Sequence, residues 1–185
     1  MNTWPRYTLG SLCNVITGGT PQRSNPRYFN GDIPWVKIND LLQEKVKFTE
    51  EKITLAGLQN SSAKILPKGT VLISIFATIG RTAQLEIEAC TNQAIAGLVI
   101  KSNEITPGYL RRFLDGHKDS LTSIARGVAQ LNINSSTLKS VNVPVPPLPE
   151  QKRIVDTLES LDSLRRERRR SIELLDELTQ SIFLD

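Results

Sequence analysis

Three short segments combine glycine with hydroxyl, amide and guanidinium side chains, the groups that contact nucleic acids. They lie at 17–23 (TGGTPQR), 77–82 (ATIGRT) and 125–132 (ARGVAQLN). Glycine lets the backbone approach a phosphate, Thr and backbone N–H groups bond phosphate oxygens, and Arg, Gln and Asn bond base edges through paired hydrogen bonds. The sequence leaves open which side chains would read bases and which would bind phosphate. The candidates for DNA contact, with one further lysine, are Thr20, Gln22, Arg23, Lys37, Thr78, Arg81, Arg126, Gln130 and Asn132.

The chain lacks the residue constellations of the common enzyme classes. It has neither the glycine-rich loop of nucleotide-binding enzymes nor the Asn/Asp-Pro-Pro-aromatic tetrad of amino-methyltransferases. Its single histidine, His117, has no cysteine or second histidine nearby, and its two cysteines are far apart. Asp32, Asp40 and Glu44 could form a metal cluster, although turn and helix-cap roles are the favoured alternative. We therefore expect a binding protein with no catalytic residues, no metal site and no cofactor of its own.

Charge and hydropathy favour a protein of the cytoplasm. The formal net charge is +4 and the pI is near 9.2, which suits phosphate-rich partners but also occurs in proteins that bind no nucleic acid. No apolar run approaches the ~20 residues of a membrane span, and the N-terminus lacks the residue order of a signal peptide. The densest basic block, at 165–170, has three open interpretations: a solvated helix face, a contact with DNA phosphates, or a contact with a protein partner.

Most elements that must position the candidate loops are predicted strands. Runs of β-branched residues bounded by turn signals predict strands at 33–38, 70–77, 94–100 and 140–145. Apolar residues at helical spacing predict helices at 9–16 and 107–121. Because strands dominate without strict β–α alternation, we predict an α+β fold rather than a doubly wound sheet.

The chain divides at a proline-rich segment. Four prolines fall within seven residues, at 143–149. Each lacks an N–H and fixes φ, so this segment predicts neither helix nor inner strand but an extended, stiff connector. The predicted organisation is a globular domain at 1–145, a connector at 146–149 and a helical region at 150–185.

The region after the connector predicts one long helix with an apolar stripe. About 35 residues at ~1.5 Å each would span roughly 50 Å, which is longer than one small domain can cover. Apolar residues recur at spacings of four and three, interrupted by Arg165 and Arg168, as in a coiled-coil heptad. We expect a partner helix; the alternative is a helix that folds back onto its own domain. The predicted pairing residues are Ile154, Leu158, Leu161, Ile172, Leu175 and Ile182.

The order of several short motifs resembles the specificity subunits of type I restriction–modification systems. The resemblance covers nearly the whole chain and includes an aromatic-x-Gly-x-Ile-Pro-Trp signature within 28–35. The matching segments are Trp4 with Leu9-Gly10, Gly18 to Pro21, Tyr28 to Trp35, Ser62 to Leu72, Ile79-Gly80, Asn92-Gln93, Gly127 to Ile133, and Pro146 to Ile154.

The resemblance implies a subunit without enzymatic activity that reads double-stranded DNA for its partners. Specificity subunits bind modification subunits, which methylate adenine with S-adenosylmethionine, and in the complete complex they direct restriction subunits. Each of their recognition domains reads one half of a split target, and their helices, in an arrangement that suggests antiparallel pairing, hold the domains apart. A usual specificity subunit has two recognition domains and two helical regions, whereas this sequence has one of each.

Several alternatives stay open at this point. The chain is a natural half-subunit or a shortened form of a longer one. A half-subunit could restore the two-fold arrangement by pairing its helix, as an antiparallel coiled coil, with a second copy of itself, which predicts a palindromic split target. The rival interpretations are a recognition subunit of a related bifunctional restriction–methylation enzyme, and a vestigial or regulatory half-subunit that dimerises without productive DNA reading.

Overall fold

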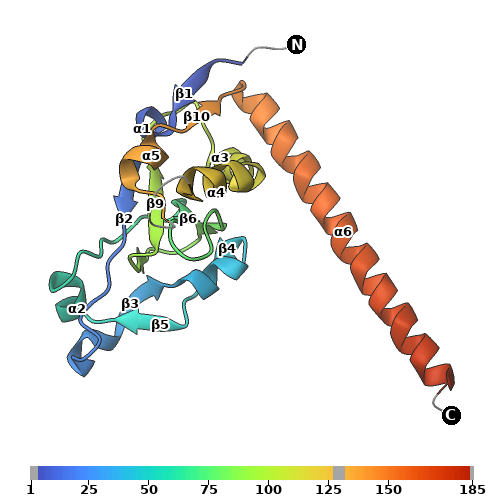
Figure 1. The fold of residues 1–185 in the computed structure, drawn as a ribbon, viewed down its shortest axis with the longest axis horizontal. Coiled ribbons are helices and arrows are strands. Elements are labelled where there is room, and N and C mark those ends of the chain that lie inside the picture. The colour runs from blue at the N-terminus through green and yellow to red at the C-terminus, as the bar shows by residue number, and fades with distance from the viewer. Residues whose placement is uncertain (1–3, 127–131, 184–185) are drawn as a thin grey trace.

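Short strands and helices fill the first four-fifths of the chain, and one long helix follows them (Figure 1). The computed structural model describes residues 4–126 and 132–183. The strands are β1 (Arg6–Thr8), β2 (Cys13–Thr17), β3 (Phe29–Val36), β4 (Lys45–Val46), β5 (Glu51–Ile53), β6 (Val71–Ser74), β7 (Thr82–Leu85), β8 (Cys90–Thr91), β9 (Ile95–Ile100) and β10 (Asn142–Pro144). The helices are α1 (Leu9–Leu12), α2 (Leu55–Gln59), α3 (Pro107–Gly116), α4 (Lys118–Arg126), α5 (Ser135–Lys139) and α6 (Leu148–Phe183), with single turns η1 (Pro26–Tyr28) and η2 (Ile38–Leu42).

The strands form three sheets. The largest has the order β2-β9-β6-β7-β4, and its strand β9 is antiparallel to both neighbours, so that Leu98 lies opposite Val15 of β2 and Val71 of β6. A second sheet has the order β5-β3-β8, and a third pairs β1 with β10. The predicted mixed α+β class is therefore confirmed, and β3, β6, β9 and β10 correspond to the four predicted strands.

The core lies on both faces of the largest sheet. All four residues of β6 are buried, as expected for an inner strand with protein on each side. On one face, Val71 and Ile73 pack in a cluster with residues of α1, α3 and α5. On the other, Leu72 packs with residues of β3, β4 and β7. A smaller cluster around Trp35 joins β3 to β5 and β8.

The predicted helix at 9–16 is wrong in its second half. α1 covers one turn, and β2 begins at Cys13. Val15, Ile16 and Thr17 are β-branched, a residue class that favours a strand when a neighbour is available, and β9 supplies the antiparallel neighbour. The apolar spacing in this segment is too short to distinguish a helix from a strand. The strand is what carries the chain to the first glycine-rich loop.

The predicted helix at 107–121 is two helices. α3 ends at Gly116, a poor helix former, and the N–H of His117 bonds the carbonyl of Leu114 in a closing turn. α4 then begins at Lys118. The exposed imidazole of His117 lies against the Phe113 ring, with centroids 4.0 Å apart, and its Nδ1 is 2.9 Å from the Phe113 carbonyl oxygen.

The boundary of the long helix also differs from the prediction. α6 begins at Leu148, with Pro149 in its first turn, where the missing N–H of proline removes no helical bond. Pro144 ends β10 opposite Arg6, in a sheet whose two strands are both edges. Pro144 therefore ends a strand and Pro149 lies in the first turn of a helix, and only residues 145–147, with Pro146 and Pro147, connect the two.

The first four turns of α6 are fixed to the preceding domain. Gln151 is fully buried, and a Cβ added at Gly108 of α3 would lie 3.6 Å from Val155. Arg112 of α3 donates to Asp162 at 2.6 Å. From Leu164 to Ile182 every side chain is exposed, and Figure 1 shows this part as a rod that leaves the body. The expectation that the proline segment keeps the helix off its own domain is wrong here, because the folded-back alternative holds for this first part.

Candidate nucleic-acid interface

The first and third glycine-containing segments, and the two residues that lead into the second, come together around one hollow. It has a volume of about 260 Å³, and residues from β2, the loops after β6 and β8, and the segment before α5 line it. These segments are far apart in the chain, so the convergence is a property of the fold and not of local sequence. The lining residues are Thr17, Gly18, Ile75, Phe76, Gln93, Asn132, Ile133, Asn134 and Ser135.

Backbone bonds fix the first loop to the loop after β8. The N–H of Gly18 donates to the Ile95 carbonyl at 3.0 Å, and that of Gly19 to the Thr91 carbonyl at 2.9 Å. A Cβ on Gly18 would lie 2.1 Å from the Asn92 carbonyl oxygen, so only glycine fits this approach. The next residue, Thr20, has its hydroxyl hydrogen-bonded to the side-chain oxygen of Gln93. The loop therefore presents its polar groups from a rigid base.

The second loop is the hairpin between β6 and β7, and a serine holds it closed. The Ser74 hydroxyl donates to the Thr78 carbonyl and accepts from the Arg81 N–H at 2.9 Å. Ala77 has a φ of 57°, in the left-handed region that non-glycine residues rarely adopt. The preceding Phe76 keeps 41% of its surface exposed. The half-buried side chains of Thr78 and Arg81 therefore sit on a tight turn that also projects an aromatic ring.

The third segment meets the second at Asn132. Phe76 and Asn132 form an isolated antiparallel bridge, and the N–H of Ile133 donates to the Ile75 carbonyl at 3.1 Å. Arg126 is the last residue of α4, and its side chain lies outside what the structure describes. Gln130 also lies outside the described residues. Of the third segment, only its end is thus placed at the hollow.

Arg23 and Lys37 are placed differently from the other candidates, because both are ion-paired with one carboxylate. Glu51 accepts from Arg23 at 2.9 Å and from Lys37 at 2.7 Å, and Lys37 also pairs with Glu50 at 3.1 Å. The Arg23 guanidinium lies 4.8 Å from the ring centroids of Phe29 and Trp35. The hydrogen bond between Lys37 and Glu51 lowers the pKa of Glu51 and raises the pKa of Lys37.

These contacts also tie the first loop to β3. The Trp35 indole N–H donates to the Gly19 carbonyl at 3.0 Å, and its ring is 1% exposed. Gln22 beside Arg23 is exposed. A phosphate would have to compete with Glu51 for both cations, whereas among residues 4–126 and 132–183 no carboxylate forms an ion pair with Arg81. The structure thus places Asn132 in the hollow and bonds Thr20 to its lining residue Gln93, places Thr78 and Arg81 on the adjacent turn, and sets Arg23 and Lys37 apart as an ion-paired group.

Three side chains at the hollow are not among the residues that the sequence predicts for DNA contact, and they lie outside the three glycine-containing segments. Gln93 and Asn134 line the hollow with amide groups, and Phe76 borders it with an exposed ring. Gln93 belongs to the Asn92-Gln93 pair that carries part of the family resemblance, so a signal for it existed. No comparable signal marks Phe76, because an apolar residue at the end of an apolar, β-branched run usually indicates a core position.

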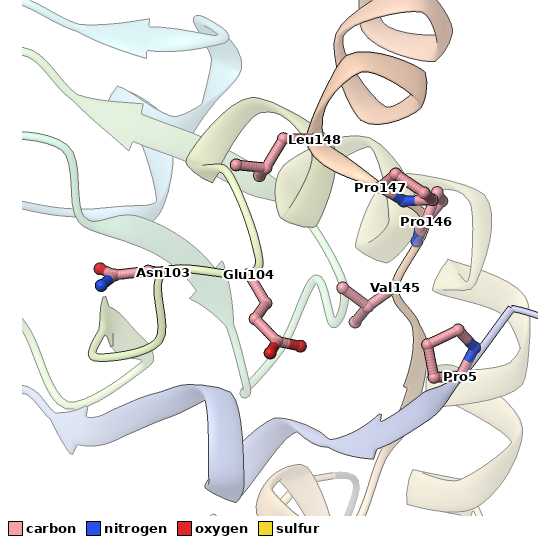
Figure 2. Close-up of a pocket in the computed structure, with 7 residues that line it drawn as sticks. All are labelled: Pro5, Asn103, Glu104, Val145, Pro146, Pro147 and Leu148. Carbon is pink, nitrogen blue, oxygen red and sulfur yellow. The ribbon is translucent and has the colours of Figure 1, made fainter.

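A second hollow, apolar and of about 310 Å³, lies at the joint between the domain and α6 (Figure 2). Figure 2 shows Val145, Leu148 and three prolines around it, with the Glu104 carboxylate at its side. Beside it, the Gln151 amide donates to the carbonyls of Glu104 at 2.6 Å and Pro146 at 2.8 Å, and its oxygen accepts from the Thr106 N–H at 2.9 Å. These bonds anchor the first turn of α6 to the loop that precedes α3.

An ion-pair network between α3 and α6 makes a second attachment of the long helix to the domain. Arg111 of α3 bonds Glu44 at 2.9 Å and Asp115 at 3.2 Å. Its neighbour Arg112, 10% exposed at the side chain, bonds Asp162 of α6 at 2.6 Å and lies 3.7 Å from Glu44. Burial raises the pKa of Asp115, and the hydrogen bond from Thr82 and the nearby arginines oppose this shift. The network therefore sets the angle at which α6 leaves the domain.

Elsewhere, the described residues offer little for catalysis or metal binding. Within residues 4–126 and 132–183, no group of three His, Cys, Asp or Glu side chains is placed to hold a metal ion. Burial raises the pKa of both Cys13 and Cys90 to about 12, which disfavours the reactive thiolate. None of the described helices is long and apolar enough to cross a membrane.

The predicted pairing residues of α6 divide into two sets. Ile154 is half-buried and packs against the domain core, and Leu158 is 36% exposed. The remaining four, Leu161, Ile172, Leu175 and Ile182, are between 45% and 65% exposed. Part of the predicted seam thus meets its own domain, and most of it faces outward.

Together these features define a sheet-and-loop domain mounted on a helical arm. The family profile described as "Type I restriction modification DNA specificity domain" matches residues 1–175. The chain therefore belongs to the family of type I restriction–modification DNA specificity domains.

Relatives and solved structures agree with this assignment. The type I restriction enzyme MjaIX specificity subunit of Methanocaldococcus jannaschii is 28% identical over 184 residues, which cover 97% of this chain and 43% of that protein. The HindI specificity subunit of Haemophilus influenzae is also 28% identical, over 94% of this chain and 39% of that protein.

Two solved structures share the fold at 24% sequence identity. One chain, from a study of complex assembly and conformational transition of the type I R-M system, has a TM-score of 0.77 over 98% of this chain and 45% of its own length. The HsdS subunit of Thermoanaerobacter tengcongensis has a TM-score of 0.69, over 88% of this chain and 38% of its own. The chain thus spans less than half the length of these relatives.

Proposed function

We propose that this chain reads one half of a split DNA target for a type I restriction–modification complex, through the loops around the hollow at Gln93. The observation that carries the proposal is the convergence of segments from distant parts of the chain on one open hollow, in whose largely apolar wall stand the amides of Gln93, Asn132 and Asn134. Glycines hold the backbones close, and amide and hydroxyl groups line the hollow, as base-edge and phosphate recognition requires.

Within this proposal the chain is the non-catalytic member of its complex. The modification subunits would bind S-adenosylmethionine and methylate adenine, and the restriction subunits would join through the assembled complex. The chain itself would hold no cofactor and would act in the cytoplasm. Two relatives carry the name of type I restriction enzyme specificity subunit, which supports this division of labour.

The test is selection of bound duplexes from a random DNA pool, with the full chain and a modification subunit of the same system. We expect an enriched half-site of a few base pairs. Arg81→Ala should then relax the preference at one base pair, at a cost of ~1–3 kcal/mol, if its guanidinium reads a base. If Arg81 binds phosphate, affinity should fall for every sequence alike and the salt dependence should flatten.

Arg153→Ala supplies the matched control. It removes the same charge from an exposed site on α6, where Arg153 pairs with Glu150 at 2.6 Å. Equal effects of the two substitutions would mean that only overall charge matters, and that would contradict reading by the loops. Recovery of no preferred sequence would contradict the proposal as a whole.

A further inference from the structure

The hollow near Gln93 combines an apolar wall with an exposed aromatic ring. Ile75 and Ile133, which line it, are 4% and 2% exposed, and most of the lining surface is apolar. Phe76 follows Ile75 at the hollow and keeps 41% of its surface exposed, on a backbone that the bridge to Asn132 holds in place. A phosphate makes no use of an apolar wall, which instead fits an apolar group of a ligand.

The Asn134 amide can offer a ligand only a hydrogen-bond donor. As the N-cap of α5, its side-chain oxygen accepts from the Thr137 N–H at 2.8 Å and from the Ser136 hydroxyl at 2.6 Å. A carbonyl oxygen has two lone pairs, so these two bonds occupy it. The amino group of this exposed side chain is the part that remains to bond a ligand, and an amino group of an amide donates.

The Gln93 amide is oriented in the same sense. Its oxygen accepts from the Thr20 hydroxyl, so the amino group is directed elsewhere as a second donor. The described residues that line the hollow include neither arginine nor lysine. The hollow therefore offers uncharged donors beside apolar surface.

In the major groove, thymine is the base whose edge joins an acceptor to an apolar group. Its O4 accepts a hydrogen bond, and its C5-methyl group lies next to O4. We propose that the hollow takes the major-groove edge of one thymine, with the methyl group against the Phe76 ring and O4 accepting from the Asn134 amino group. This proposal rests on the proposed function and deepens it, since it names the base that the hollow reads.

The other three bases match the hollow less well. Cytosine presents an amino donor, which would face the donor of Asn134. Adenine is read by an amide that gives both its oxygen and its amino group, and the Asn134 oxygen is already occupied. Guanine has two acceptors but no methyl group for the apolar wall, and its usual reader is arginine.

Base analogues test the proposal without a change in the protein. The full chain, with a modification subunit of the same system, is given the half-site that selection recovers. Each thymine of both strands is then replaced in turn by uracil, which keeps O4 and lacks only the methyl group. We expect one position at which uracil weakens binding by about fourfold, the ratio that corresponds to the burial of one methyl group.

Phe76→Ala tests whether the ring makes this contact. The variant should bind the thymine and uracil duplexes equally, because the side chain that distinguishes them is gone. Phe48→Ala is the matched control, since it removes a ring that is 67% exposed on the segment between β4 and β5, outside the hollow. It should keep the fourfold difference. Circular dichroism checks that both variants fold.

Asn134→Asp exchanges the donor for an acceptor and keeps the cap of α5, because a carboxylate oxygen also accepts from the Thr137 N–H. At the uracil-sensitive position we expect the preference to move from thymine to cytosine, whose amino group a carboxylate accepts. Asn103→Asp adds the same charge at an exposed site outside the hollow, and it should weaken binding without a change of preference.

Each other outcome overturns the proposal. A half-site without thymine, no uracil-sensitive position, or a uracil effect that survives Phe76→Ala would exclude the methyl contact. A preference for thymine that Asn134→Asp leaves unchanged would exclude the contact with O4. In all these cases the selected half-site would still support the proposed reading of DNA. A random pool that yields no preferred sequence would contradict that reading and this inference together, so the two failures are distinguishable.

Discussion

The domain buries its apolar side chains, whereas the outer part of α6 exposes side chains of the same types. In β6, apolar side chains on both faces of the strand are completely or nearly completely buried. In α6 beyond Leu164, leucines and isoleucines at regular spacing are more than half exposed. Burial of apolar surface is the main favourable contribution to folding, so the sheet clusters hold the chain's own fold. In the outer part of α6 the apolar side chains stay exposed in the single chain and contribute little to its fold.

Polar groups show the same contrast. Around the hollow, backbone bonds and glycines fix the loops before any ligand arrives, which lowers the entropy lost on binding. On α6, polar contacts to the domain are concentrated at two places, Gln151 and Asp162. The orientation of the arm therefore depends on few groups, while the loop cluster depends on many.

The largest expected difference is between two leucines changed in the same way. Leu72→Ala removes a fully buried side chain of β6 and should lower the free energy of unfolding by ~2–5 kcal/mol, because it leaves a cavity. Leu175→Ala, at a side chain 61% exposed, should change it by less than about 0.5 kcal/mol at concentrations where the chain is monomeric. Urea unfolding of both variants measures this. Similar losses would mean that the arm contributes to the fold of the single chain.

Gln151 should show the next largest effect. Gln151→Leu keeps the helix and the volume but leaves the Glu104 and Pro146 carbonyls without this partner, at a cost of roughly 1–3 kcal/mol. Hydrogen exchange should rise in the first turns of α6 as the joint loosens. Lys152→Leu, at an exposed neighbour, is the control and should have little effect. Unchanged exchange in Gln151→Leu would show that packing alone holds the arm.

Much of this comparison is predictable from the sequence, because strong periodic patterns specify both regions. The absence of glycine and proline after Pro149 and the heptad of leucines and isoleucines predict α6, and β-branched runs predict β6 and β9. The three glycine-rich segments also mark the loops that meet at the hollow. The patterns do not specify which face of each helix or strand packs against which neighbouring element.

The joint illustrates the limit. Two partners of Gln151, the Glu104 carbonyl and the Thr106 N–H, are backbone groups on a loop more than 40 residues away, and no local pattern marks them. Nor does spacing reveal that Arg23 and Lys37 share Glu51, because the sharing depends on how β3 pairs with β5. The segment 9–16 fails for a related reason: four or five residues of apolar spacing fit a helix or a strand, and β9 decides between them.

A smaller effect is expected from the ion pair that sets the angle of the arm. A double-mutant cycle of Arg112→Ala and Asp162→Ala should give a coupling energy of about 1–2 kcal/mol, since the pair is charged and Arg112 is almost buried. The pair Arg153–Glu150 lies within α6, with Arg153 73% exposed, and should couple by only ~0.2–0.5 kcal/mol. Equal coupling in both cycles would show that the joint pair does not orient the arm.

The smallest expected effect belongs to Glu51 beside the first loop, and it depends on pH. The hydrogen bond from Lys37 holds the pKa of Glu51 below its ordinary value, so folding is favoured most when this carboxyl is ionised in both states. The added stability is present above the ordinary carboxyl pKa and is lost as the pH falls through the lower, folded-state pKa. For a partly exposed pair it should amount to ~0–1 kcal/mol. Glu51→Gln should remove this part of the acid-dependent loss in urea unfolding between pH 7 and about pH 3. An unchanged slope would show that the ion pairs of Glu51 with Arg23 and Lys37 add no stability. The two cations would then lose no folding stability by binding a phosphate instead.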